Sequence, residues 1–361
     1  RTQMKKFFLL LIALFFIAPA PAQAASHTIW IATPANRNYA GQIINKDFEK
    51  SLAVDGDLGK LVFDPIAKPR TWIMDAAMLE DVQFLVNKKS TIATNWLAQL
   101  KKVSRSDTIY ATAYGNPDVI YLKSLAPSEL NFFYAVGQQH LQAVLMKNVL
   151  SEKGSGFAWK RAVIDRDLRE FFNTSREEFT LLSTVVNPKE VESDRARIAQ
   201  LFSPQLSAKN RLALFRDFES GQAKVINKLR IVSGRYQITT ANEKIPITLV
   251  NDFEAPVKVD LYFTPMNSRV TFPQYRQITL NAKSKIQVSV PIGVIAAGDT
   301  TVMARFENGK GKTIGANGMI ELSSTIISPA VTKFTTGAGL LLILAAVAQS
   351  VRRVRKSRAE K

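Results

Sequence analysis

The sequence contains no cysteine among its 361 residues and only two histidines. The lack of cysteine excludes a disulfide framework, thiol catalysis and zinc sites built from cysteine ligands. There is also no His-Glu-x-x-His zinc motif, no phosphate-binding P-loop and no Gly-x-Ser-x-Gly nucleophile motif. The cores must therefore hold together by apolar burial, and the sequence predicts no metal and no cofactor.

The two histidines are weak candidates for catalysis. His27 lies close to the predicted start of the exported chain, and His140 lies inside a helical run between Gln139 and Leu141. A single histidine on a helix is most often structural, because catalysis and metal binding need further groups at fixed spacing.

The C-terminal residues predict a membrane anchor. An apolar run of 18 residues, 334–351, is followed at once by a basic tail, 352–361. A helix of this length just crosses a bilayer core of about 30 Å, and flanking cations mark the cytoplasmic side. We therefore expect a transmembrane helix over 331–351 and a cytoplasmic tail anchored by Arg352, Arg353, Arg355, Lys356 and Arg358.

The other end of the chain predicts export. Lys5 and Lys6 precede an apolar run over 7–18, and the small-residue motif Ala22-Gln23-Ala24 follows. This order is typical of a secretory signal peptide over 1–24, cut after Ala24. The two terminal segments together predict a single-pass plasma-membrane protein with its bulk extracytoplasmic.

The charge of the exported part is strongly positive. Without the leader and the tail, 39 basic and 29 acidic residues remain, a net charge of +10. Such a surface favours anionic envelope material such as wall polymers or phosphorylated wall precursors. The compartment argues against nucleic acid. Ordinary solubility is the alternative explanation.

Residues 25–125 predict a βα domain. The β-branched and aromatic runs 27–32, 60–64, 70–75 and 107–114 are typical of strands, and 75–86 and 93–103 have helical spacing. Alternating strands and helices indicate parallel βα units.

Two further regions follow. Residues 126–230 are predicted to be a helical segment, which is either a separate bundle or packed on the βα domain. Residues 231–328 contain eight short alternating runs separated by turns, which predict an immunoglobulin-like β-sandwich. The eight predicted strands are 236–240, 245–252, 257–263, 269–272, 276–280, 285–290, 300–306 and 317–324.

Three aspartates are candidate catalytic residues because each follows a predicted strand of the βα domain. Carboxylates placed in this way resemble those of barrel glycosidases, in which paired acids perform general acid and base catalysis. The competing interpretation is helix capping and turn formation. The candidates are Asp64, Asp75 and Asp118, with Trp30, Trp72, Tyr110 and Tyr114 nearby as possible sugar-stacking residues.

The order of these features resembles an actinobacterial family of single-pass cell-envelope proteins of unknown function, often encoded near the lipid II flippase gene. The resemblance is carried by 28–38 with 55–61, by RTWIMDAAMLEDV (70–82), by 94–100 with 108–122, and by 245–263. It implies a degenerate glycosidase-like or TIM-barrel-like βα unit, a helical segment, a membrane-proximal sandwich and a terminal span. Asn116 stands where the family's turn has an acid, which weakens the catalytic interpretation.

Three functions remain open from the sequence. The favoured one is a non-catalytic envelope protein that binds wall glycan, a wall precursor or a partner in wall assembly. The second is a carbohydrate hydrolase or deacetylase that uses the strand-end aspartates. The third is a purely structural scaffold for membrane partners.

Overall fold

The structure is a computed structural model that describes residues 27–152, 161–325 and 329–359, with side chains of the last helix described over 336–352. The chain divides into two compact units. The first is formed by residues up to Val163 together with Ala196–Leu214, and the second by Ile164–Arg195 and Phe215–Lys361. The predicted helical segment 126–230 thus contributes to both units. The predicted signal peptide, with its cleavage site at Ala24, lies outside the described residues.

The first unit is built on a four-stranded parallel sheet in the order β1-β2-β3-β4. Its strands are β1 (His27–Ile31), β2 (Arg70–Met74), β3 (Thr108–Ala111) and β4 (Leu150–Ser151). Alternate residues of β1 to β3 face the same core. Neighbouring positions on the three strands form two rows of buried side chains, which are Ile29, Trp72 and Ile109, and Ile31, Met74 and Ala111.

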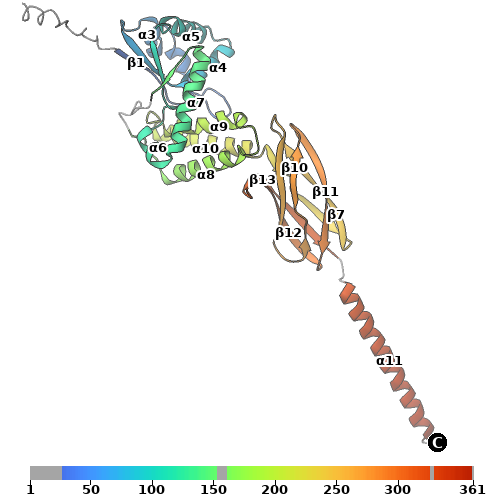
Figure 1. Cartoon of the computed structure of the whole chain (residues 1–361). Helices are drawn as coiled ribbons and strands as arrows, with labels where there is room; N and C mark the ends of the chain where they lie inside the picture. The colour runs from blue at the N-terminus through green and yellow to red at the C-terminus, as the bar shows by residue number, and fades with distance from the viewer. Residues whose placement is uncertain (1–26, 153–160, 326–328, 360–361) are drawn as a thin grey trace, which may run out of the picture. The chain divides into compact units, whose positions relative to one another are not determined.

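Helices supply the other half of that core (Figure 1). Trp96 is fully buried, and its indole N–H donates to the Leu58 carbonyl at 2.9 Å, so the polar end of the ring is satisfied. The helices of this unit are α2 (Phe48–Ser51), α3 (Asp57–Phe63), α4 (Ala76–Asn87), α5 (Thr91–Val103), α6 (Val119–Leu125) and α7 (Pro127–Leu145).

The degenerate barrel-like expectation for this unit is confirmed only as a half-barrel, since the four parallel strands follow one another in chain order without closing. The described strands form an open sheet, and the predicted strand 60–64 lies mostly in helix α3. The helix packs closely on the preceding turn, since a Cβ on Gly59 would lie 1.6 Å from the Ala53 carbonyl oxygen. This is a tertiary contact that alternation of side chains cannot reveal. Asp64 consequently ends a helix rather than a strand.

Four helical segments connect the sheet to the sandwich. Ser175, inside α8, is fully buried and its hydroxyl donates to Gln222 in α10. The segments are α8 (Arg166–Leu182), α9 (Lys189–Arg197), the 3-10 helix η1 (Ile198–Phe202) and α10 (Ala208–Ile226).

The second unit contains the sandwich, and each of the eight predicted strand segments overlaps an observed strand. The strands follow the path β10-β8-β12-β13-β5-β7-β11-β9, with β6 beside β13 (Figure 1). The short strand β5 pairs with both β13 and β7, which links the two layers. The strands are β5 (Leu229–Ile231), β6 (Gly234–Ile238), β7 (Asn242–Asn251), β8 (Val257–Pro265), β9 (Val270–Thr271), β10 (Tyr275–Leu280), β11 (Ser284–Val294), β12 (Gly298–Glu307) and β13 (Thr313–Ser324).

The described part of the chain contradicts the predicted transmembrane helix over 331–351. Helix α11 (Pro329–Ala359) runs through this segment, yet no helix among the described residues is long and apolar enough to cross a membrane. Between Thr336 and Gln349 the helix has 12 described residues without a polar side chain, against about 20 needed for a span. The predicted single-pass location in the plasma membrane is corrected on the same finding. Of the five predicted anchor cations only the Arg352 side chain is described, and it is exposed.

Candidate functional site

The carboxyl ends of strands β1 to β3 gather most of the candidate residues of the first unit. Asp75 follows β2 directly, and its Oδ1 accepts the backbone N–H of Ala77 at 3.1 Å and of Gly115 at 2.8 Å. The first bond caps helix α4, and the second ties the loop after β3 to the end of β2.

Asp75 is 1 % exposed. Burial raises the pKa of this carboxyl from its ordinary value of 3.8 to about 7, although both backbone hydrogen bonds act in the opposite direction. A value near 7 suits a general acid or base. A side chain this deeply buried and bonded to two backbone amides is, however, out of reach of a polymeric substrate.

The other two aspartates have different surroundings. Asp118 is fully buried, caps helix α6 through the Tyr121 N–H, and accepts from Arg161 Nε at 2.9 Å and the Ala162 N–H at 3.0 Å. Asp64 is exposed at the end of α3. Asp75 and Asp118 are therefore both N-caps, which is the structural alternative that the sequence left open.

The four candidate aromatic residues divide into two pairs. Trp72 and Tyr114 are buried, so their ring faces are not available to a sugar. Trp30 and Tyr110 are half-buried. They are the strand neighbours of Ile73 on either side, on the face of the sheet that points away from the core.

A hydrogen-bonded chain at the same edge was not predicted. Tyr114 donates its hydroxyl to Glu80 Oε2 at 2.6 Å, and the other oxygen of Glu80 bonds His140 Nδ1. The Tyr114 and His140 rings meet edge to face, with centroids 5.7 Å apart. Burial raises the pKa of Tyr114 well above its ordinary value, and the Glu80 carboxylate adds to this effect. The three residues come from a loop and two helices, so no spacing in the sequence points to them.

Asp81 fastens the loop after β1 to helix α4. Its carboxylate accepts the backbone N–H of Asn36 at 3.3 Å and pairs with Arg37 Nε at 2.6 Å. Burial raises the pKa of Asp81, while Arg37 and Asn36 favour its ionised form. These bonds, like those of Asp75, hold loops in place.

The residues described by the structure contain no group of three or more His, Asp or Glu side chains arranged to hold a metal ion. Four buried carboxyl groups of the first unit, Asp75, Asp81, Asp107 and Asp118, are instead paired with arginine, lysine or backbone N–H groups. Asp107 is an example, since it bonds Arg70 Nε at 2.6 Å and Trp72 Nε1 at 2.8 Å.

A second candidate feature is the basic segment, residues 88–105. Residues 82–106 contain five cations and no acid. None of the five has a carboxylate partner among the described residues. Four of the cations are exposed and Lys101 is half-buried. The members of the basic segment are Lys88, Lys89, Lys101, Lys102 and Arg105.

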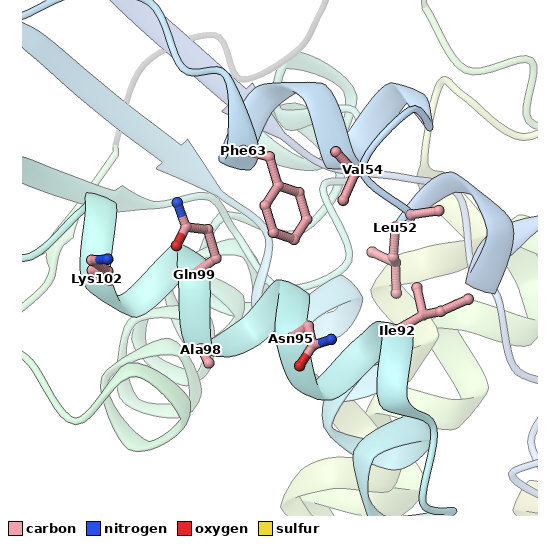
Figure 2. Close-up of a pocket in the computed structure, with 9 residues that line it drawn as sticks. Leu52, Val54, Phe63, Ile92, Asn95, Ala98, Gln99 and Lys102 are labelled. Carbon is pink, nitrogen blue, oxygen red and sulfur yellow. The ribbon is translucent and has the colours of Figure 1, made fainter.

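An apolar groove runs along the outer face of α5 beside the basic segment. It has a volume of about 510 Å³ and lies between α5 and the chain from α2 to α3 (Figure 2). Such volumes are typical of ligand sites. The lining residues are Leu52, Ala53, Val54, Phe63, Ile92, Asn95, Ala98, Gln99 and Lys102.

The architecture is thus a mixed α/β unit followed by an immunoglobulin-like sandwich. The chain belongs to a family of unknown function, DUF6049, whose model matches residues 133–359. The predicted family resemblance is confirmed to this extent, and the match carries no information on source organism or neighbouring genes. A comparison with curated proteins finds no match.

Three of the solved structures similar to this chain each match about a quarter of it. WR4, an MSP family member of C. elegans, covers 27% of this chain and 99% of its own, at 8% identity and a TM-score of 0.22. PapD-like domain 7 of human CEP192 covers 28% and 86%, at 14% identity and 0.22. The E. coli chaperone DraB covers 27% and 55%, at 8% identity and 0.20. Likenesses at these TM-scores say nothing about activity.

Proposed function

We propose that the protein is a non-catalytic, extracytoplasmic protein of the cell envelope that binds an anionic wall polymer along its basic segment. The observation that carries this proposal is the position of the cations that have no carboxylate partner. Five of them lie within 18 residues around α5, and none pairs with a carboxylate among the described residues.

The distribution of charge between the units supports the proposal. Without residues 1–24, the first unit contains 19 basic and 12 acidic residues, a net charge of +7. The second unit, counted to Lys333, contains 20 basic and 17 acidic residues, a net charge of +3. A polyanion is therefore attracted more strongly to the first unit than to the second unit taken as a whole.

The geometry of the basic segment fits a linear polymer. Lys88 and Lys89 precede α5, while Lys101, Lys102 and Arg105 lie at its end. The two groups lie at opposite ends of a helix of 13 residues, which is about 20 Å long. Phosphodiester units spaced along a chain can contact both groups at once, whereas a single small anion can contact only one.

The hydrolase alternative has less support. Asp75 has a raised pKa, but it and Asp118 are buried N-caps, and the exposed Asp64 lies after a different element. We therefore assign these aspartates to holding loops rather than to chemistry.

The test measures binding of the full chain to a soluble poly(glycerol phosphate) polymer at low salt. The binding variant replaces all five cations of the basic segment with Gln. The control variant makes the same change at five exposed cations of the sandwich, which are Lys244, Lys258, Arg276, Lys285 and Lys312.

Both variants lose the same net charge, so only position differs between them. We expect the binding variant to lose about tenfold or more in affinity and the control to lose about twofold or less, with both effects shrinking at high salt. Equal losses in the two variants, or no binding by the wild type, would reject the proposal.

A further inference from the structure

The apolar groove has two unlike walls. One is the outer face of α5, where Ile92, Asn95, Gln99 and Lys102 recur at helical spacing. The other is formed by the segment that leads from α2 into α3, with Leu52 and Val54 at one end and Phe63 further along (Figure 2). The groove therefore has a direction, from Ile92 to Lys102.

Apolar side chains are exposed along this groove. Val54 is 64 % exposed and Ile92 is 38 % exposed, while Phe63 is half-buried. Exposed apolar surface gathered in one concave place marks a binding site more often than scattered apolar residues do. A ligand with a hydrocarbon portion would remove this surface from water.

The charge of the groove is confined to one end. Lys102 is the one charged residue among those that line it, and Figure 2 shows this side chain at the opposite end from Leu52 and Ile92. The α5 wall has no acid within residues 82–106. On the other wall Asp55 and Asp64 adjoin lining residues in sequence, but neither lines the groove.

We propose that the apolar groove binds a single-chain amphiphile with a carboxylate head, that is, a medium-chain fatty acid. The hydrocarbon chain lies along Val54, Phe63, Ile92 and Ala98, and the carboxylate pairs with Lys102. One cation at the end of an apolar trough matches a ligand with one anionic head and one tail. This site shares Lys102 with the basic segment but differs from polymer binding, which uses all five cations and not the apolar trough.

The experiment measures binding of octanoate, decanoate and dodecanoate to the full chain below their micelle concentrations. Each buried methylene contributes up to about fourfold in affinity, so affinity should rise steadily with chain length. The variant Ala98→Trp fills the groove from an exposed position. Thr94→Trp is the matched control, because Thr94 is exposed on the same helix and does not line the groove.

We expect Ala98→Trp to weaken dodecanoate binding at least tenfold and Thr94→Trp to leave it within twofold of wild type. We also expect Lys102→Gln to weaken dodecanoate binding about fivefold, without a matching effect on dodecanol, which has the same chain and no charge. Lys101→Gln, a neighbour outside the groove, should change neither ligand's affinity by more than twofold.

The proposal is overturned if the wild type binds none of the three carboxylates, if affinity does not depend on chain length, or if the two tryptophan variants behave alike. The last result would place bound amphiphile elsewhere, for example on the exposed apolar residues of α11. Because Ala98→Trp keeps all five cations, its polymer binding should equal that of wild type. A failure of the amphiphile to bind the groove can therefore be distinguished from a failure of the polymer to bind the basic segment.

Discussion

The α/β unit and the β-sandwich are stabilised by different means. Among the described residues, the first unit buries carboxyl groups at Asp75, Asp81, Asp107 and Asp118, each with hydrogen-bond partners. The sandwich relies on alternating apolar residues, and its most connected buried polar side chain is the neutral Asn251. Loops of the first unit are therefore held by several buried carboxyl groups. In the sandwich the loop after β7 is held by amide hydrogen bonds, and the buried carboxyl of Glu307 pairs with Arg305 at 2.7 Å.

This difference shows where function can reside. Carboxylates that hold loops are not free for chemistry, whereas the five cations of the basic segment have no carboxylate partner among the described residues and are available to a ligand. Strand-end acids in a parallel sheet thus need their hydrogen bonds counted before they are assigned to catalysis.

The largest expected effect is on the buried ion pair of the first unit. Asp81→Ala removes the partner of Arg37 and the oxygen that accepts two N–H groups of Asn36, so we expect a loss of about 3 kcal/mol in the free energy of unfolding. Urea unfolding measures it. Asp47→Ala removes an exposed pair with Lys50 and should cost no more than about 0.5 kcal/mol. Similar losses of stability in the two variants would contradict the claim that buried carboxyl groups stabilise the first unit more than exposed ones.

The second prediction concerns pH. Asp75 binds its proton near pH 7 in the folded chain and near 3.8 when unfolded. The folded state therefore holds a proton that the unfolded state has lost between these values, and its contribution to stability falls as pH rises from about 4 to about 7.

Asp75→Asn removes this dependence and keeps an acceptor for the Ala77 and Gly115 amides. Relative to wild type, the variant should gain stability across that pH range, by up to about 4 kcal/mol. Parallel stability curves for the two proteins between pH 4 and 8 would show that Asp75 does not titrate in this way.

The sandwich has its own sensitive position. Asn251 donates to the carbonyls of Ala255, Leu280 and Asn281 and accepts the Phe253 N–H. Asn251→Ala leaves these groups without that partner, so we expect a loss of about 2 kcal/mol, measured by thermal unfolding. The loss should not vary with pH. A pH-dependent loss would mean that charge stabilises this unit as well.

The smallest expected effect is on the outer surface of the sandwich. Arg235 and Glu321 pair across β6 and β13, but their side chains are 82% and 54% exposed. Glu321→Ala should therefore change the free energy of unfolding by no more than about 0.5 kcal/mol. A loss of about 2 kcal/mol would show that surface charge contributes to this unit too.

Local patterns in the sequence predicted most of the strands and helices. Alternation in 245–252 and 285–290 corresponds to strands β7 and β11, which pair over ten residues. The three-residue strand β5 is too short to give a pattern. Helix α3 was mistaken for a strand because its close packing on Ala53 is a contact made by the folded chain.

The candidate site was less predictable for the same reason. The position of Asp75 at the start of a helix followed from the sequence, whereas Asp118 was expected in a turn and instead caps helix α6. The full hydrogen bonding of the two residues did not follow from the sequence. Glu80 lies 60 residues from His140 and 34 from Tyr114, so only the fold brings the three together. The absence of acids from 82–106 was visible in the sequence. Only the position of α5 in the fold shows that the cations of this segment lie at the two ends of one helix.

Hydrogen–deuterium exchange of the full chain, with and without poly(glycerol phosphate), tests the central claim most directly. We predict slower exchange of backbone amides within residues 88–105 when the polymer is present, and no change in strands β5 to β13. Protection in the sandwich, or no protection in either unit at saturating polymer, would contradict the assignment of binding to the basic segment.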